Sequence, residues 1–355
     1  MKVVSRIYLD PGCMIIFRIC ILGLIIFLLS IQIGLSQITS TSIPKNWTQI
    51  TFNTAEDFHA HFSPDGTKIV FDSNRGGKYA VFVYDLKTKE TKQLTSGKIP
   101  CDHPNWFPDS KNVLCECGSD GRKDLFSILV ADTTMTRLTN TTKFNGGGQV
   151  SPRGDRISFL SNRNGNWDVF LMTVEDGNIL QATSNKGDDV DVDWSSDGSK
   201  LLFTTIQNQR FQICIMDGDG SQYRQITDGN YSNRNPRFNA DGDKIAFVSD
   251  RSGSDQIYLM NLDGTGEEQL TVSKTLKYDL HWRQNSKSLL YNVGEEQDAE
   301  IYLLSTTDKK EVPLTQNRSR EAIPSFSPDG KKLLFVSAQT GNLEVFLMWR
   351  MDIKK

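Results

Sequence analysis

Short runs of aromatic and β-branched residues recur along this chain at a fixed spacing of 44 residues. One row of these positions contains Phe71, Cys115, Phe159, Phe203, Phe247, Tyr291 and Phe335. A second row lies 11 residues further on and contains Phe82, Phe126, Phe170, Cys214, Tyr258, Tyr302 and Phe346. The apolar positions after residue 36 do not follow a 3.6-residue period, so the pattern predicts β-strands rather than helices.

Polar turns separate the predicted strands at the same spacing. Ser63-Pro64-Asp65-Gly66 is the first, with a proline that fixes φ and a glycine that closes the turn. The last position of this turn recurs at Ser110, Gly154, Gly198, Gly242, Ser286 and Gly330. A Leu-Thr step recurs with it, and its threonines are Thr51, Thr95, Thr139, Thr183, Thr227, Thr271 and Thr315. Each unit therefore holds four short strands, which is typical of β-propeller blades.

The two ends of the chain indicate how the ring of blades closes. The threonine row begins at Thr51, before the first turn, and the chain stops before an eighth copy. The last unit thus lacks an outer strand, which the segment from Trp47 to Phe52 can supply. Pairing the two ends in this way leaves no blade with an open edge. We predict an all-β fold, a seven-bladed β-propeller of four-stranded blades, closed by the N-terminal strand that completes the last blade.

An apolar stretch from Met14 to Leu35 precedes the repeats, and Lys2, Arg6 and Arg18 lie on its N-terminal side. Its core is short for a membrane span and has the length of a signal-peptide core. We assign residues 1–36 to a signal peptide, with an uncleaved signal anchor as the alternative, and Met14 is an alternative start. Residues 37–45 are a linker and residues 46–355 the propeller. This organisation predicts export to the periplasm or secretion, with membrane contact only through an uncleaved leader.

The charge balance excludes several classes of function. The chain has 40 basic and 43 acidic residues, a net charge of −3. Residues 1–36 hold three basic and one acidic residue, so the remainder has 37 basic and 42 acidic residues, a net charge of −5. No run of lysine or arginine stands out, and no nucleic acid partner is expected. Hydrolase nucleophile elbows, phosphate loops and dinucleotide fingerprints do not occur in the sequence. We expect a monomer.

Four of the six cysteines lie in the repeats. If the turn between Phe107 and Asn112 joins two strands, Cys101 lies opposite Cys117 to within a residue or two. An exported protein can oxidise such a pair, so a Cys101–Cys117 disulfide is one interpretation. Two free thiols are the other. Cys115 and Cys214 occupy the aromatic rows and are predicted to be buried packing residues.

The segment from Phe62 to Phe71, followed by Ser73-Asn74-Arg75, resembles the repeat of the TolB-type propellers. Ser161-Asn162-Arg163 and Ser249-Asp250-Arg251 repeat the end of this motif, and Phe326 to Phe335 repeats its start. The resemblance covers essentially all of residues 46–355. It implies a periplasmic role in which the propeller binds an envelope protein or polysaccharide. TolB itself has an α/β domain ahead of a six-bladed propeller, whereas here seven repeats follow directly on the predicted leader.

Two further rows lie seven and five residues before the last position of each turn, where each innermost strand begins near the mouth of the central channel. These rows contain all four histidines of the chain. The candidate binding residues at this axial mouth are His59, His61, His103, Asn105, Gln149, Asp191, Asp193, Arg237, Asp279 and His281. Gly147, Asn235, Ile323 and Ser325 complete the two rows.

The histidines allow two interpretations. Neutral imidazoles bind Zn²⁺ or Mn²⁺, so His59, His61, His103 and His281 are candidate ligands of a divalent cation. No other cofactor is expected and no catalytic residue is assigned. The alternative is that these histidines cap strands by hydrogen bonding. Oligogalacturonate lyases are similar in blade count and in histidines, which implies a metal-dependent carbohydrate-active enzyme. The other function is a non-enzymatic binding or scaffold module of the cell envelope.

The acidic segments of the fourth unit give three smaller predictions. In Asp189-Val190-Asp191-Val192-Asp193 the alternation predicts that the three carboxylates share one face of a strand. Arg237 occupies the row of Asp193 one blade further on, so we expect a cross-blade ion pair between them. Asp217-Gly218-Asp219-Gly220 resembles the start of a calcium loop but lacks the later ligands, and is predicted to be a hairpin turn.

Overall fold

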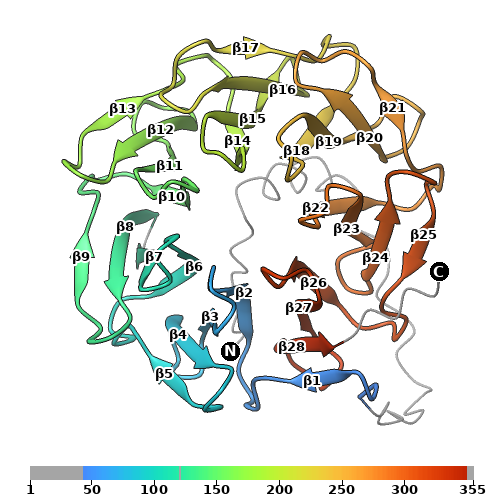
Figure 1. Cartoon of the computed structure of the whole chain (residues 1–355). Coiled ribbons are helices and arrows are strands. Elements are labelled where there is room, and N and C mark those ends of the chain that lie inside the picture. The colour runs from blue at the N-terminus through green and yellow to red at the C-terminus, as the bar shows by residue number, and fades with distance from the viewer. Residues whose placement is uncertain (1–42, 120, 350–355) are drawn as a thin grey trace, which may run out of the picture. The chain divides into compact units, whose positions relative to one another are not determined.

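Seven four-stranded antiparallel sheets surround a central axis (Figure 1). The structure, a computed structural model, describes residues 43–119 and 121–349. The predicted leader at residues 1–36 lies outside the described residues. In the part of the chain that is described, no helix is long and apolar enough to cross a membrane. The prediction of an all-β, seven-bladed propeller is confirmed.

Each blade contributes one strand to each of four concentric positions, and blades 1 to 7 are numbered in the chain order of their innermost strands. The strands nearest the axis are β2 (Asp57–Phe62), β6 (Cys101–Trp106), β10 (Asn145–Val150), β14 (Asp189–Trp194), β18 (Asn233–Phe238), β22 (Lys277–Trp282) and β26 (Glu321–Phe326). The second strands are β3 (Lys68–Ser73), β7 (Asn112–Ser119), β11 (Arg156–Ser161), β15 (Lys200–Gln207), β19 (Lys244–Ser249), β23 (Ser288–Val293) and β27 (Lys332–Ser337). The third strands are β4 (Ala80–Asp85), β8 (Arg122–Leu129), β12 (Asp168–Thr173), β16 (Arg210–Asp217), β20 (Gln256–Asn261), β24 (Glu300–Ser305) and β28 (Glu344–Trp349). The outer strands are β5 (Thr91–Gln93), β9 (Met135–Arg137), β13 (Ile179–Gln181), β17 (Arg224–Gln225), β21 (Glu268–Gln269), β25 (Glu311–Pro313) and β1 (Trp47–Gln49).

The aromatic rows form the core between neighbouring blades. Phe71 is fully buried and stacks on Phe82 of the adjacent strand, with ring centroids 5.7 Å apart. The same cluster includes Leu334 and Val345 of the preceding blade, so each blade buries its face against the next. Burying one such side chain contributes about 1.5–3 kcal/mol. Residues that are 44 positions apart in the sequence therefore make equivalent core contacts in successive blades.

The Ser-Asn-Arg end of the repeat motif has a structural role. Arg75 donates from Nε to Ser73 Oγ (2.9 Å) and from one terminal nitrogen to Asp57 Oδ1 (2.9 Å). Its guanidinium also lies 4.4 Å from the centroid of the Phe82 ring, a cation–π contact. One arginine thus ties the first three strands of its blade together. Arg163 and Arg251 make the same contacts in their blades.

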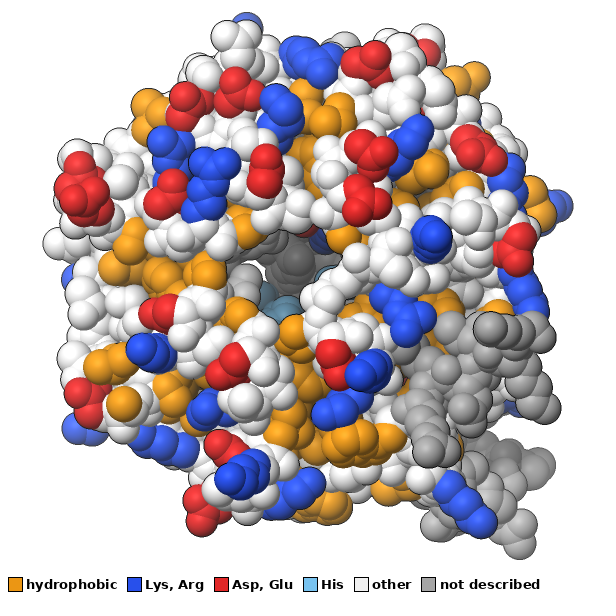
Figure 2. Space-filling view, in the orientation of Figure 1, with side chains coloured by type: hydrophobic (Ala, Val, Ile, Leu, Met, Phe, Trp, Pro, Cys, Tyr) orange, Lys and Arg blue, Asp and Glu red, His pale blue; other side chains and the backbone are white. Residues whose placement is uncertain are grey.

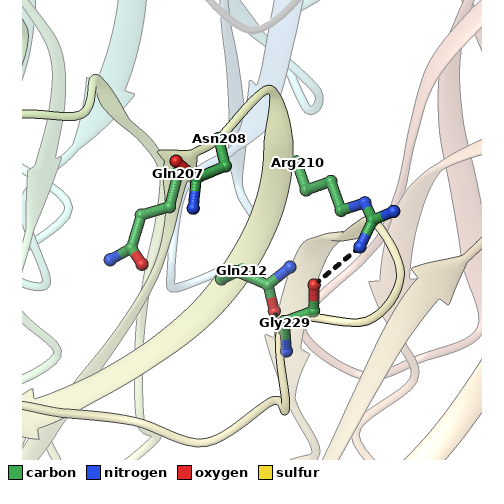
Figure 3. Close-up of a pocket in the computed structure, with 5 residues that line it drawn as sticks. All are labelled: Gln207, Asn208, Arg210, Gln212 and Gly229. Carbon is green, nitrogen blue, oxygen red and sulfur yellow. Dashed lines mark hydrogen bonds between the residues drawn. The ribbon is translucent and has the colours of Figure 1, made fainter.

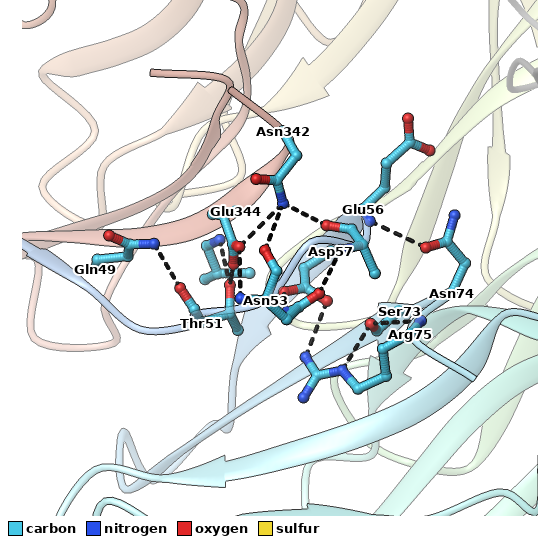
Figure 4. Close-up of polar contacts among 12 residues, drawn as sticks. Gln49, Thr51, Asn53, Glu56, Asp57, Ser73, Asn74, Arg75, Asn342 and Glu344 are labelled. Atoms are coloured by element: carbon cyan, nitrogen blue, oxygen red, sulfur yellow. Dashed lines mark hydrogen bonds and ion pairs between the residues drawn. The ribbon is translucent and has the colours of Figure 1, made fainter. Parts of the chain in front are cut away.

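The ring closes between β1 and β28, as predicted. Trp47 pairs with Met348, and Val345 N donates to Thr51 Oγ1 at 2.9 Å. The other blades form this amide–threonine bond internally, so β1 reproduces the missing outer strand; Ile257 N and Thr271 Oγ1, for example, are 2.9 Å apart. The amide of Asn342 also donates to Asn53 O at 3.0 Å across the seam (Figure 4). The two ends of the propeller are therefore joined by specific polar contacts as well as by the strand pairing.

Every innermost strand contains a β-bulge at the same position. The bulged residue has a φ between 44° and 61° in all seven blades, and these residues are His59, His103, Gly147, Asp191, Asn235, Asp279 and Ile323. Glycine, asparagine, aspartate and histidine adopt this left-handed conformation more readily than other residues. The backbone thus accounts for much of the composition of this row, with Ile323 as the exception.

The bulge overturns the prediction that Asp189, Asp191 and Asp193 share one face. Asp189 pairs with Thr205, whereas Asp193 pairs with Leu202. Directly opposite residues of an antiparallel pair project to the same face, and positions 205 and 202 are an odd number apart on a regular strand. Asp189 and Asp193 therefore lie on opposite faces. The prediction is wrong because the bulge inserts an extra residue, which two-residue alternation does not include.

The Cys101–Cys117 disulfide is confirmed, with an S–S distance of 2.11 Å. The two cysteines are direct partners in the register of β6 and β7. In blades 3 and 5 the same register holds the polar pairs Asn145–Ser161 and Asn233–Ser249. The disulfide thus takes the place of a polar pair. Cys115 and Cys214 are free and buried, as predicted.

Asp217-Gly218-Asp219-Gly220 forms the predicted turn between β16 and β17. Gly220 N donates to Asp217 O at 2.8 Å. The Asp219 carboxylate accepts hydrogen bonds from Ser221 N (2.9 Å) and Ser221 Oγ (2.6 Å). Hydrogen bonds of the turn therefore account for this acidic segment.

Candidate functional site at the axial mouth

Two rings of side chains line the channel. The mouth ring consists of the bulged residues His59, His103, Gly147, Asp191, Asn235, Asp279 and Ile323. The channel ring lies two residues further along each strand and consists of His61, Asn105, Gln149, Asp193, Arg237, His281 and Ser325. All of these residues are partly or fully exposed, whereas most of the residues between them are buried. Figure 2 shows histidine side chains in the wall of the central opening.

The first part of the site joins blades 1 and 2. His59 Nδ1 lies 2.7 Å from Asp72 Oδ2, and the same oxygen accepts a hydrogen bond from His103 N at 2.9 Å. The imidazole rings of His59 and His103 lie against each other, with centroids 3.8 Å apart. The second oxygen of Asp72, Oδ1, is buried and has no hydrogen-bond partner in the described protein. The two predicted histidines are therefore organised by an aspartate on β3.

The second part of the site centres on Lys123 of β8. Its Nζ lies 2.5 Å from Asp102 Oδ1 and 3.5 Å from Glu116 Oε2. His103 Nδ1 lies 3.2 Å from the same Asp102 oxygen and 4.0 Å from Glu116 Oε2. We call His59, Asp72, Asp102, His103, Glu116 and Lys123 the mouth cluster. Three carboxylates in this cluster face one ammonium group and His103.

The carboxylates control the protonation of His103. Burial lowers its pKa, but the charge of Glu116 and the hydrogen bond and charge of Asp102 raise it by more, to about 9. Burial likewise acts to raise the pKa of Asp102, and its contacts with His103 and Lys123 hold that pKa well below the usual range. His103 is therefore protonated at neutral pH, and together with Lys123 it faces the carboxylates of Asp102 and Glu116.

Protonated His103 should make folding stability depend on pH. Its folded pKa of about 9 lies above the ordinary 6.5, so its contribution is complete below pH 6.5 and is lost as the pH rises through 9. We expect the free energy of unfolding to fall by about 2–3 kcal/mol over this range, as urea titrations at several pH values would measure.

The matched variant is His103→Asn, which tolerates the positive φ of this position. It should remove most of this slope. Glu321, whose pKa burial raises to about 8, acts in the same direction and should leave a smaller slope in the variant. Equal slopes in the two proteins would contradict the assignment to His103.

Acidic groups also bind the amides that the bulges release from strand pairing. Glu116 Oε1 accepts a hydrogen bond from Gly147 N of the next blade at 2.6 Å. Asp191 Oδ2 accepts one from Asn235 N, again one blade further on, at 3.3 Å. With the Asp72–His103 contact, these bonds join neighbouring blades at the level of the mouth ring. Part of the acidic character of the mouth is therefore structural.

The channel ring differs from its prediction at one contact. Asp193 Oδ2 accepts a hydrogen bond from Phe238 N at 2.8 Å, and Arg237 donates to Pro236 O at 2.9 Å. Within the described residues, Asp193 and Arg237 do not form the expected ion pair, because the carboxylate binds a backbone amide of the next blade and the guanidinium binds the Pro236 carbonyl. Burial raises the pKa of Asp193 to about 6, and the charge of Arg237 opposes this shift.

His61 and His281 lie in the channel ring. Burial, with the charges of His59 and His103, lowers the pKa of His61 to about 4. Burial, with the charges of Arg237 and His61, lowers the pKa of His281 to about 3. Both histidines are therefore neutral at neutral pH, unlike His103.

Two groups of described residues could each offer three ligand atoms to one cation: His59, Asp72 and His103, and Asp102, His103 and Glu116. His61 and His281 belong to neither group. The Lys123 ammonium already lies between Asp102 and Glu116, so the second group does not fit a metal. In the first group, Asp72 Oδ1 is free to ligate, but His103 would have to lose its proton. The structure therefore leaves one candidate cation position, between His59 and Asp72.

Asp72, Asp102, Glu116 and Lys123 were not among the residues predicted from the sequence. A signal for two of them existed, because Asp72 and Glu116 each interrupt an apolar strand, as in Ile69-Val70-Phe71-Asp72. Buried charges in such runs require a partner. Lys123 carries no such signal, since it lies in the charged sequence Arg122-Lys123-Asp124.

A polar cavity of about 320 Å³ lies away from these rings, at the turn between β15 and β16 (Figure 3). Gln207, Asn208, Arg210, Gln212 and Gly229 line it. Arg210 donates to Gly229 O at 3.1 Å. The amide of Gln212 bonds Thr227, Gly229 and Tyr231. These contacts fix the loop between blades 4 and 5, and we assign the cavity a structural role.

The fold is a β-propeller built from seven copies of one sequence repeat. Its channel carries ionisable side chains. A family described as TolB beta propeller domain matches residues 77–235 and 193–298, which together are more than half of the chain. The chain belongs to this family.

The similar proteins include TolB proteins and a lyase. The Tol-Pal system protein TolB of Ruthia magnifica subsp. Calyptogena magnifica is 32% identical over 79 residues, 22% of this chain and 19% of that protein. The chain thus matches only about a fifth of this curated relative. An oligogalacturonate lyase in complex with manganese aligns with a TM-score of 0.73 at 15% identity, over 86% of this chain and 93% of that one. TolB of Acinetobacter baumannii aligns with a TM-score of 0.53 at 18% identity, over 78% and 76%. At these identities the structural likeness shows the fold alone.

Proposed function

We propose that the protein is an exported, non-enzymatic binding module of the cell envelope that recognises a protein or glycan through its axial mouth. The observation that carries this proposal is the mouth itself, where two rings of mostly polar side chains on the seven innermost strands border one opening. Innermost strands joined by interblade hydrogen bonds hold these side chains in place before any partner arrives, which lowers the entropy cost of binding.

The disulfide and the family support the setting of this function. Disulfides persist in oxidising compartments, which fits export. One relative is by name a component of the Tol-Pal system. The charges of the mouth cluster are largely neutralised among themselves, which suits a preformed recognition surface better than a reactive group.

Sedimentation with isolated cell envelopes tests the proposal. The purified chain should pellet with envelopes, and Asp191→Asn with Asp279→Asn should reduce the bound fraction about tenfold or more, because both residues belong to the mouth ring. Asparagine keeps the positive φ, so the fold should be retained. The matched control, Asp65→Asn with Asp241→Asn, removes the same charge from turns at the other ends of the strands. Equal loss in both variants, or no pelleting of the wild-type chain, would overturn the proposal. Protease treatment of the envelopes separates a protein partner from a glycan.

A metal-dependent carbohydrate-active enzyme is the second candidate, and the partnerless Asp72 Oδ1 beside His59 favours it. Manganese or zinc bound there would act as a Lewis acid on a sugar carboxylate or hydroxyl. His59 and Asp72 would hold the ion, and His103 would join them only after losing its proton. Elemental analysis of the protein used for sedimentation decides between the two. One equivalent of metal that is lost in Asp72→Asn supports the second candidate.

A further inference from the structure

We propose that Arg237 is the centre of an anion subsite inside the channel ring, built to bind the carboxylate group of a ligand that enters through the axial mouth. This inference rests on the proposed function, because it names the chemistry that the same mouth would recognise.

The charge of Arg237 is not neutralised by a direct partner. In the described part of the chain its guanidinium makes one hydrogen bond, to Pro236 O at 2.9 Å, although it has five N–H donors. Arg234 on the same strand, by contrast, forms an ion pair with Asp255. Arg237 is only partly buried, so its remaining donors can reach water or a ligand in the channel.

Neighbouring blades hold the backbone of Arg237 on both sides. Trp282 Nε1 of blade 6 donates to Arg237 O at 3.1 Å, and Phe238 N donates to Asp193 of blade 4 at 2.8 Å. The side chain therefore starts from a fixed position on the channel wall. Such preorganisation lowers the cost of binding a charged group.

The surroundings of Arg237 favour an anion. His281 and His61 belong to the same ring, and each imidazole carries at least one N–H donor in either protonation state. The one acid beside Arg237 in this ring, Asp193, is bound by the Phe238 amide and has a pKa raised by burial. Arg237 is thus the permanent cation of this ring with N–H donors beside it, an arrangement that suits a single anionic group.

A carboxylate fits this arrangement best, because a guanidinium can bind its two oxygens through two parallel N–H···O bonds. A sugar acid and the C-terminus of a peptide both carry this group. The channel ring contains only polar side chains, so it offers donors and acceptors to either ligand rather than an apolar pocket.

Ligand-observed NMR titrations test the subsite with small probes. D-galacturonate represents a sugar acid, N-acetylglycine represents a peptide terminus, and D-galactose is the neutral control for the first. We expect saturable binding of at least one carboxylate, no comparable binding of galactose, and affinity lowered about tenfold or more in Arg237→Gln. Arg237→Lys should weaken binding less, because it keeps the charge but loses the paired bonds.

Arg224→Gln is the matched control, because Arg224 also donates to a single carbonyl, Leu262 O, but lies on outer strand β17. It should bind like the wild-type chain. Equal affinity for galacturonate and galactose, unchanged binding in Arg237→Gln, or no carboxylate binding at all would overturn the inference. Preference for one probe identifies the source of the carboxylate.

The two proposals can fail separately. A chain that pellets with envelopes but binds no carboxylate overturns this inference alone. A chain that binds carboxylates through Arg237 but does not pellet overturns the proposed function alone.

Discussion

Replacing Lys123 with methionine should lower the free energy of unfolding by about 3–5 kcal/mol. The Lys123 side chain is 8% exposed, and its acidic partners Asp102 and Glu116 are 13% and 4% exposed. Methionine fills a similar volume but removes the ammonium group that Asp102 and Glu116 share, and the single charge of His103 cannot neutralise both carboxylates. Urea or guanidinium titrations at neutral pH measure the change.

Two controls make this prediction specific. Lys200→Met removes a lysine whose pair with Asp217 is 39% and 37% exposed, so it should cost less than about 1 kcal/mol. Adding Asp102→Asn and Glu116→Gln to Lys123→Met should restore part of the stability, because neutral amides need no cation. Similar small losses in Lys123→Met and Lys200→Met would contradict the buried ion cluster.

The fold was predictable because the repeat places the same physical requirement at the same position seven times. The aromatic rows mark the contacts between blades, and the Leu-Thr row marks the outer strand. The threonine of that row also explains the closure, since Thr51 makes with Val345 the bond that Thr271 makes with Ile257 inside its own blade. A pattern repeated this often averages out the ambiguity of any single strand.

The site was only partly predictable, because its geometry departs from regular strands. The bulge in each innermost strand changes the face of the residues that follow it, so alternation misplaced the aspartates of β14. It also selects residues that tolerate a positive φ, which makes a backbone requirement resemble a row of ligands. Lys123 reaches the mouth from β8, and nothing in a one-dimensional pattern indicates that contact.

Removing the disulfide should cost about 3 kcal/mol, the second large effect. Cys101 and Cys117 are 16 residues apart, and closing a loop of this size restricts the unfolded chain by about that amount. We expect Cys101→Ala with Cys117→Ala to lower the free energy of unfolding accordingly. A reductant should destabilise the wild-type protein to a similar extent and leave the variant unchanged. If the reductant does not move the wild-type transition, the prediction fails.

A second variant tests what the disulfide replaces. Cys101→Asn with Cys117→Ser recreates the pair found in blades 3 and 5, and should recover part of the lost stability. Recovery should be incomplete, because those blades add Arg163 or Arg251 to bind the asparagine, whereas Ser119 occupies that place in blade 2. The strand pair that carries Asp102 and Glu116 would then be held less firmly. Blade 2 thus binds its innermost strand covalently next to Asp102, a member of the mouth cluster.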